Sequence, residues 1–108
     1  MKKNVNGIEY DTKLSTKLDT YDNGLIVRYM SNRSDYYYRE ELYRTPSGEF
    51  FLYAIGGRLS QYAGPVQDGR HTVGEDIIPK TQSEAVAWLG EHHHPIDAEK
   101  ILKKILQK

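Results

Sequence analysis

The clearest hydrophobic pattern lies in the middle of the chain, where strand-like runs at residues 37–43 and 49–55 flank Thr45-Pro46-Ser47-Gly48. Proline presets one backbone angle of a tight turn and glycine accepts another, so this pattern predicts an antiparallel β-hairpin. Because side chains alternate along a strand, the second run presents two largely apolar faces. These faces consist of Phe50, Leu52 and Ala54 on one side and Phe51, Tyr53 and Ile55 on the other. We therefore expect this strand in the interior of a sheet, covered on both sides.

The N-terminal part predicts a second, smaller hairpin followed by a helix. Residues 2–10 form two short extended pieces around Asn6-Gly7, a dipeptide that tolerates the positive φ angles of a hairpin turn. In residues 11–19, Leu14 and Leu18 are four apart, which favours a short helix. Residues 25–30 alternate as in a strand after turn-forming residues.

The segment after the central hairpin predicts an irregular connection and a short strand. Gly56-Gly57 ends the hairpin, and residues 64–74 contain three glycines, which marks the most flexible candidate segment of the chain. This connection is expected to be irregular unless it contains a short strand. Ile77-Ile78-Pro79 has the composition of a short strand.

The C-terminal third predicts two helices. Thr81 and Glu84 have the spacing of a capping box, and an apolar stripe follows before Gly90 is expected to end the helix. The stripe consists of Ala85, Trp88 and Leu89. A final helix is expected from about Pro95 to near the chain end. The predicted fold class is therefore α+β: a small antiparallel sheet with a central hairpin, packed by a C-terminal helical pair, in one domain over residues 1–108.

Composition narrows the function classes. Fifteen lysines and arginines balance fifteen aspartates and glutamates, which removes the global electrostatic argument for a nucleic-acid binder. The absence of cysteine rules out disulfides and thiolate zinc sites. The polar N-terminus does not have the pattern of a signal peptide, and no run approaches the roughly 20 apolar residues that span a bilayer. We expect a cytoplasmic protein without membrane contact.

Three groups of residues are candidates for a catalytic or metal site. His92-His93-His94 are neighbours in sequence, and adjacent side chains in an extended segment point in different directions, which disfavours a shared metal ion. His71 with Glu75 and Asp76 resembles an acid/base group but lacks an activated nucleophile. Glu40 and Glu41 are adjacent in a predicted strand and therefore point to opposite faces. We expect no catalytic residue, no metal and no cofactor.

Tyrosine and arginine residues are instead the best candidates for partner binding, because both residue types are enriched at binding hot spots. At least one tyrosine of the Tyr36-Tyr37-Tyr38-Arg39 segment is expected to face the core, while the others contribute to recognition. Stacking of these rings on unpaired bases, with arginines on phosphates, is the alternative use, so RNA contact stays open. The predicted partner-binding residues are Tyr36, Tyr37, Tyr38, Arg39, Arg44 and Arg58.

Three segments carry a resemblance to a known family. They are NGIEYDT at residues 6–12, EELYRTPSGEFFLYAIGGRLSQYA at residues 40–63 and IIPKTQSEAVAWL at residues 77–89. In these segments the chain resembles small proteins encoded in phages and mobile elements of Firmicutes, some of which look like anti-CRISPR proteins directed at type II systems. The resemblance implies an inhibitor of the host cell's defence that binds Cas9, or its guide-RNA complex, and blocks engagement of guide RNA or DNA.

Two other functions remain as alternatives. A nucleic-acid-binding accessory protein of a mobile element would bind free RNA or single-stranded DNA with a steep salt dependence. A metal-dependent nuclease would use His71 or the three consecutive histidines. The sequence leaves the oligomeric state open.

Overall fold

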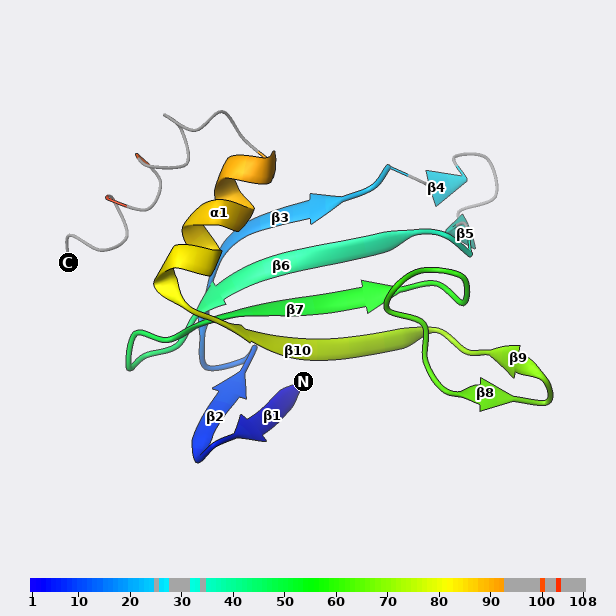
Figure 1. Ribbon diagram of the computed structural model, residues 1–108, viewed down its shortest axis with the longest axis horizontal. Helices are drawn as coiled ribbons and strands as arrows, with labels where there is room; N and C mark the ends of the chain where they lie inside the picture. The colour runs from blue at the N-terminus through cyan, green and yellow to red at the C-terminus, as the bar shows by residue number, and fades with distance from the viewer. Residues whose placement is uncertain (25, 28–31, 34, 93–99, 101–102, 104–108) are drawn as a thin grey trace.

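The computed structural model describes residues 1–24, 26–27, 32–33, 35–92, 100 and 103, and its centre is a four-stranded antiparallel sheet (Figure 1). The strands follow the spatial order β10-β7-β6-β3, so β7 and β6 are interior and β10 and β3 form the edges. Their bounds are β3 Thr16–Asp22, β6 Tyr38–Arg44, β7 Phe50–Gly56 and β10 Gly74–Lys80.

The central hairpin predicted from the sequence is confirmed as β6 and β7. Leu42 pairs with Leu52, and Tyr43 pairs with Phe51. In the connecting turn the Thr45 N–H donates to the Glu49 carbonyl at 2.8 Å, and Gly48 has a φ of +99°. Proline and glycine therefore set the turn that fixes the register of the sheet.

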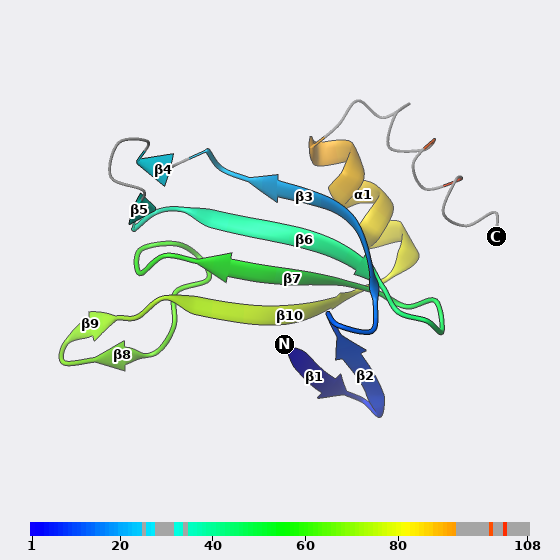
Figure 2. The ribbon, with the colours of Figure 1, turned by 180° about the vertical axis from the view of Figure 1, so that it is seen from behind.

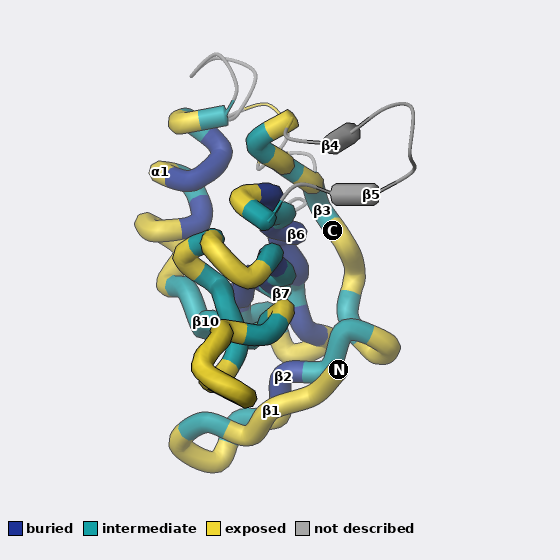
Figure 3. Tube along the Cα trace, turned by 90° about the vertical axis from the view of Figure 1, so that its right-hand side faces the viewer, coloured by how far each residue is buried: buried dark blue, intermediate teal, exposed yellow. Residues whose placement is uncertain are grey.

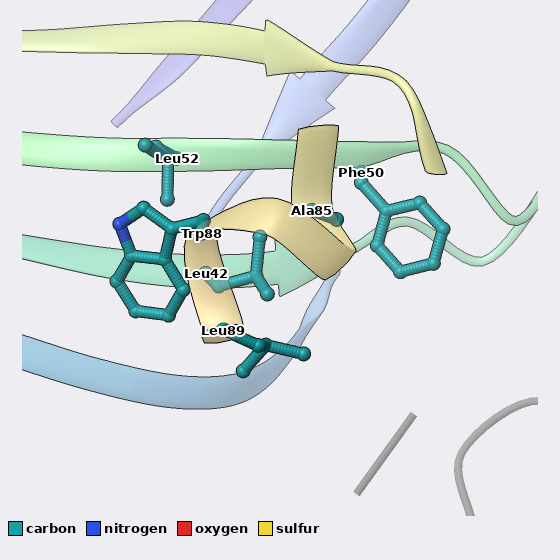
Figure 4. Packing of buried hydrophobic residues seen from close by; sticks show 6 residues of the cluster. All are labelled: Leu42, Phe50, Leu52, Ala85, Trp88 and Leu89. Carbon is teal, nitrogen blue, oxygen red and sulfur yellow. The ribbon is translucent and has the colours of Figure 1, made fainter. Parts of the chain in front are cut away.

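Strand β7 is covered on both faces, as its two apolar sides predict. On one face Leu42, Phe50 and Leu52 pack against three helical side chains (Figure 4). On the other face Phe51 packs with Tyr43 and belongs to a second cluster. The sheet thus separates two small cores, and its central strand contributes to each. The second cluster consists of Tyr10, Tyr43, Phe51 and Ile77.

Helix α1, Gln82–His92, covers the first face (Figures 1 and 3). The predicted capping box is confirmed: the Glu84 N–H donates to Thr81 Oγ1 at 3.1 Å, and the Thr81 N–H donates to Glu84 Oε1 at 2.9 Å. The predicted stripe is also confirmed, since Ala85, Trp88 and Leu89 are the buried residues of the helix.

Two helical expectations need correction. Gly90 does not end α1, which continues to His92. Glycine weakens a helix interior by only about 1 kcal/mol relative to alanine, and packing of the neighbouring Trp88 and Leu89 offsets that cost. The structure describes one helix, so the helical pair is not supported; apart from Lys100 and Lys103, the expected second helix lies outside the described residues.

The N-terminal hairpin is confirmed as β1, Lys2–Val5, and β2, Ile8–Asp11. Asn6 and Gly7 form its turn with φ angles of +52° and +82°. Tyr10 meets the Phe51 ring edge-on with 5.5 Å between centroids, which places the hairpin against the second core. Figure 2 shows the link from β2 to β3 crossing the sheet face opposite α1.

The short helix expected at residues 11–19 is wrong. The chain turns after β2 and enters strand β3 at Thr16, which pairs with β6. Leu18 and Tyr21 pack against the helix-side core, whereas Leu14 is 67% exposed. The two leucines therefore never form one apolar helical side, and pairing with a long neighbouring strand overrides the local pattern.

Two minor hairpins complete the described chain. Strands β4, Ile26–Val27, and β5, Asn32–Arg33, pair with each other; of the strand predicted at residues 25–30, only Ile26 and Val27 lie among the described residues. The connection at residues 64–74, for which a short strand was the open alternative to an irregular segment, contains the paired strands β8, Val66–Gln67, and β9, Arg70–His71. Asp68 and Gly69 make its turn with φ angles of +52° and +77°.

Candidate binding site at the distal end of the sheet

The candidate site lies at the end of the sheet where β7 finishes and β10 begins. There Gly56 pairs with Tyr38 on one side and with Gly74 on the other. We call this the distal end, because the β6–β7 turn lies at the opposite end of the same strands (Figure 1). The β8–β9 hairpin leaves the sheet at the distal end (Figure 1).

A bidentate ion pair holds the loop after β7 in place. Arg58 Nε donates to Asp35 Oδ1 at 3.2 Å. Arg58 Nη2 donates to both carboxylate oxygens of Asp35, Oδ1 and Oδ2, each at 3.1 Å. Backbone bonds from Leu59 to Asp35 and from Gly57 to Tyr37, each 2.8 Å, join the same two segments. Exposed ion pairs contribute little to stability on their own, but here the pair supports a backbone that is already hydrogen-bonded.

The base of the β8–β9 hairpin is tightly packed. The Gly64 N–H donates to the Thr72 carbonyl at 2.8 Å, and the Thr72 N–H donates to the Pro65 carbonyl at 3.1 Å. A Cβ atom on Gly74 would lie 2.0 Å from the Tyr62 carbonyl oxygen, so only glycine fits this crossing. The hairpin therefore leaves the sheet from a fixed base, while every residue from position 65 to position 71 is exposed.

Two hollows adjoin at Asp35. The first has a volume of about 450 Å³, and the second has a volume of about 350 Å³. Pockets of this size accommodate one or a few side chains of a partner. The first is lined by Asp35, Tyr37, Ile55, Gly56, Gly57, Val73, Gly74 and Glu75, and the second by Asp35, Arg58, Leu59, Gly69, Arg70 and His71.

Large apolar side chains are exposed around these hollows. Tyr36 is 58% exposed, Leu59 is 56% exposed and Val73 is 73% exposed. Single exposed apolar residues are ordinary on protein surfaces, but several beside a hollow indicate an interaction site. We call the group the distal surface; it consists of Arg58, Leu59, Arg70 and Val73, which line the hollows, together with exposed Tyr36, which lies between the lining residues Asp35 and Tyr37 in sequence, and exposed Val66 of strand β8.

The structure separates the three consecutive tyrosines. Tyr36 is exposed, whereas Tyr37 is 3% exposed and forms a wall of the larger hollow. Tyr38 is half-buried between Tyr21 and Tyr62, with ring centroids 6.2 and 5.8 Å away. Burial, foremost, and the nearby Tyr21 raise the pKa of Tyr38 above its ordinary value. Tyr36 alone of the three presents most of its ring to solvent.

The three predicted arginines also lie apart. Arg58 is at the distal end, as described. Arg39 Nε lies 3.4 Å from Glu41 Oε2, on the sheet face opposite α1. Arg44 lies at the other end of β6, where its guanidinium is 5.9 Å from the centroid of the Phe50 ring. The structure thus places Tyr37 and Arg58 in the linings of the two adjoining hollows, with exposed Tyr36 next to Tyr37 in sequence, and leaves Arg39 and Arg44 outside the distal surface.

Sequence reasoning missed the aliphatic part of the distal surface. Leu59, Val66 and Val73 lie in or beside the glycine-rich segment that was expected to be irregular. The sequence indicates their exposure in one way: each is an aliphatic residue without apolar neighbours at strand spacing, so it is not part of a sheet face that would be buried.

Glu40 and Glu41 point to opposite faces, as predicted, and both are buried. The Tyr62 hydroxyl donates to Glu40 Oε2, and Trp88 Nε1 donates to Glu40 Oε1 at 2.9 Å. On the other face the Tyr43 hydroxyl donates to Glu41 Oε1 at 3.1 Å. Burial, followed by the bond to Glu40, raises the pKa of Tyr62 above its ordinary range. These contacts tie structural elements together, because each carboxylate is occupied by donors of the core.

The residues considered for acid/base or metal chemistry do not converge. His71 Nδ1 lies 3.0 Å from the Gly64 carbonyl, the Glu75 carboxylate accepts from Tyr53, and the Asp76 carboxylate accepts from Lys3. Within the described ranges, no three histidine, cysteine, aspartate or glutamate residues are grouped to hold a metal ion. His93 and His94 lie outside the described residues. No helix in the described part of the chain has the length and apolar character to cross a membrane.

No family model, curated protein or solved structure matches the chain.

Proposed function

We propose that the chain inhibits a type II Cas9 effector in the bacterial cytoplasm by binding it through the distal surface and blocking guide-RNA or DNA engagement. The observation that carries a binding role is the exposure of Leu59 and Val73 in the linings of two adjoining hollows on a hydrogen-bonded frame; exposed Tyr36 lies between the lining residues Asp35 and Tyr37 in sequence. The choice of Cas9 as target comes from the family resemblance of the three sequence segments.

The energetics favour a binding surface. Burying a large apolar side chain stabilises an interface by about 1.5–3 kcal/mol, so three such residues supply several kcal/mol before the cost of association. The hydrogen bonds at the hairpin base and the Asp35–Arg58 pair reduce the ordering that a partner would have to impose. Tyrosine and arginine are also typical residues of energetic hot spots.

The three segments of resemblance lie mainly in the scaffold. Residues 40–63 cover the central hairpin and the loop after it, and residues 77–89 cover most of β10 and α1. Tyr36, Val66 and Val73 lie outside these segments. A shared scaffold with a separate contact surface is the arrangement we expect for inhibitors that act on different effector orthologues.

A nucleic-acid-binding accessory protein is the second candidate, and one observation favours it. Arg58, Arg70 and His71 line the smaller hollow, so side chains that can donate to phosphate are gathered there. This function predicts binding to free RNA or single-stranded DNA that weakens steeply between low and moderate salt. The neutral net charge of the chain favours the protein-binding function instead.

The test is a pull-down of the purified protein with purified Cas9 orthologues, with and without guide RNA, followed by a DNA-cleavage assay. We expect binding and loss of cleavage for at least one orthologue. The Tyr36→Ala/Leu59→Ala double variant should lose both, whereas Glu9→Gln, at an exposed position on the N-terminal hairpin, should retain both. Absence of binding and inhibition across the orthologues would refute the Cas9 assignment, and salt-sensitive binding to free RNA would favour the second candidate.

A further inference from the structure

The larger distal hollow has apolar walls and one carboxylate that no basic side chain occupies. Ile55 pairs with Glu75 across β7 and β10, so both side chains point to the face opposite α1. Tyr37 and Val73 complete the apolar wall, and three glycines contribute bare backbone. A hollow of about 450 Å³ with this lining suits a long side chain that is apolar along its length and polar at its tip.

Glu75 supplies the polar end of this hollow. Its Oε2 atom accepts a 2.5 Å hydrogen bond from the Tyr53 hydroxyl. No ion pair joins Glu75 to a lysine, arginine or histidine of the described chain. Burial, and next the bond to Glu75, raises the pKa of Tyr53 to about 12, so Tyr53 stays a neutral donor to the carboxylate at neutral pH.

Asp35, the other carboxylate of the lining, differs because Arg58 already binds it through two nitrogens. The Asp35–Arg58 pair is close to neutral as a unit, so Glu75 leaves the hollow with one uncompensated negative charge. The Asp35–Arg58 pair also lines the smaller hollow, where Arg70 adds a positive charge that would repel a cation. Charge therefore distinguishes the two hollows although they adjoin.

We propose that the larger hollow binds one basic side chain, lysine or arginine, of a protein partner. Lysine and arginine bury their methylene stems along apolar surfaces while the charged group stays polar. The stem would lie against Tyr37, Ile55 and Val73, and the charged group would donate to the Glu75 carboxylate. The inference rests on the proposed function only in that the partner is a protein; it does not require that partner to be Cas9.

The test titrates the isolated protein with N-acetyl-arginine methylamide and follows the backbone amides of Gly56, Gly57 and Gly74 by NMR. We expect saturable shifts of these amides at millimolar probe. The neutral probe N-acetyl-norleucine methylamide, which has a similar stem without the charge, should bind at least about 5-fold more weakly, since a charge-assisted bond at a partly exposed site is lost.

Two variants distinguish binding in the hollow from non-specific attraction of the cationic probe to carboxylates elsewhere on the protein. Glu75→Gln keeps an oxygen that accepts the hydrogen bond from Tyr53 but removes the negative charge. It should weaken binding of the arginine probe by about the same factor of 5. Glu9→Gln removes an exposed carboxylate elsewhere and should leave binding unchanged. Equal binding of both probes, an unaffected Glu75→Gln variant, or no saturable shift would each overturn the proposal.

The outcome is independent of the Cas9 test. If the arginine probe binds in a Glu75-dependent way while no Cas9 orthologue binds, the result supports the basic-side-chain pocket and refutes Cas9 as the target. If Cas9 binds equally to the original chain and to the Glu75→Gln variant, and the probe does not bind, the result supports Cas9 as the target and refutes the basic-side-chain pocket.

Discussion

The indole nitrogen of Trp88 donates a 2.9 Å hydrogen bond to Glu40 Oε1, and this buried contact joins α1 to the interior strand β6 across 48 positions of sequence. The Trp88 ring also packs with Leu42, Leu52 and Leu89 in the helix-side core (Figure 4). One side chain thus supplies both apolar burial and a donor to a buried carboxylate. The contact explains how a helix of 11 residues holds its position on the sheet.

Replacing Trp88 with phenylalanine should lower the free energy of unfolding by about 1.5–3 kcal/mol. The substitution retains an aromatic ring but leaves a buried carboxylate oxygen without its donor, and hydrogen bonds to charged groups are worth about this amount. Urea denaturation followed by far-UV circular dichroism measures the change. Val66→Ala, at an exposed position, is the control and should stay within about 0.5 kcal/mol of the original chain. If Trp88→Phe lowers the free energy of unfolding by no more than Val66→Ala does, the indole hydrogen bond does not have this role.

Two glycine-to-alanine substitutions should have opposite effects. A Cβ atom at Gly74 would lie 2.0 Å from the Tyr62 carbonyl oxygen, so the backbone must shift and the variant should be destabilised by more than about 2 kcal/mol. Gly90 is inside α1, and an added Cβ atom there meets nothing within 4 Å. Gly90→Ala should therefore stabilise the fold by about 0.5–1 kcal/mol. Thermal unfolding of both variants checks the pair, and a shift of the same sign in both would refute the prediction.

The protein should lose stability between about pH 10 and pH 12. Burial, foremost, raises the pKa of Tyr43 and of Tyr53 to about 12, and hydrogen bonds to Glu41 and Glu75 act in the same direction. In the unfolded chain tyrosine loses its proton near pH 10. Above about pH 10 the unfolded state therefore binds fewer protons than the folded state, and the free energy of unfolding falls as pH rises.

Urea midpoints measured from about pH 9 to pH 12 test this alkaline sensitivity, with tyrosinate absorbance near 295 nm recorded in parallel. Tyr53→Phe should show a shallower decline, because one of the tyrosines with a raised pKa is removed. A stability profile that is flat over this range would show that the tyrosines titrate alike in both states.

The Tyr36→Ala/Leu59→Ala double variant should weaken partner binding by about 10- to 100-fold with little change in stability. Both side chains are more than half exposed, so the fold gains little from them, whereas an interface that buries them depends on them. Dissociation constants from surface plasmon resonance, paired with urea midpoints, separate the two effects. Arg44→Ala lies at the opposite end of β6 and should leave binding unchanged if the distal surface is the contact.

The features predicted correctly are those whose signal is local. The central hairpin follows from Pro46 and Gly48 between two apolar runs, and the start of α1 follows from the three-residue spacing of Thr81 and Glu84. The interior place of β7 follows because both faces of residues 50–55 are apolar. In each case neighbours in sequence are also partners in space.

The failures occur where distant segments compete with a local pattern. Leu14 and Leu18 have helical spacing, but pairing with β6 draws residues 16–22 into a strand. Glycine is a typical residue at a helix end, but α1 continues through Gly90 to His92 because Trp88 and Leu89 pack against the sheet. Residues 64–74 carry glycines that favour an irregular segment, yet the close backbone crossing gives Gly64 and Gly74 a steric role at the base of an ordered hairpin.

The sequence by itself determined the antiparallel hairpin, the capped helix and the two-sided burial of the central strand, because turn chemistry and side-chain alternation act over a few residues. Only the tertiary structure decided which exposed residues lie together. Asp35, Arg58 and Val73 are separated by many positions and line two adjoining hollows because the strand register brings the ends of β6, β7 and β10 to one end of the sheet. Adjacent Tyr36, Tyr37 and Tyr38 differ in burial for a related reason: Tyr37 lines the larger hollow with residues of β7 and β10, Tyr38 lies between Tyr21 and Tyr62, and Tyr36 is left exposed.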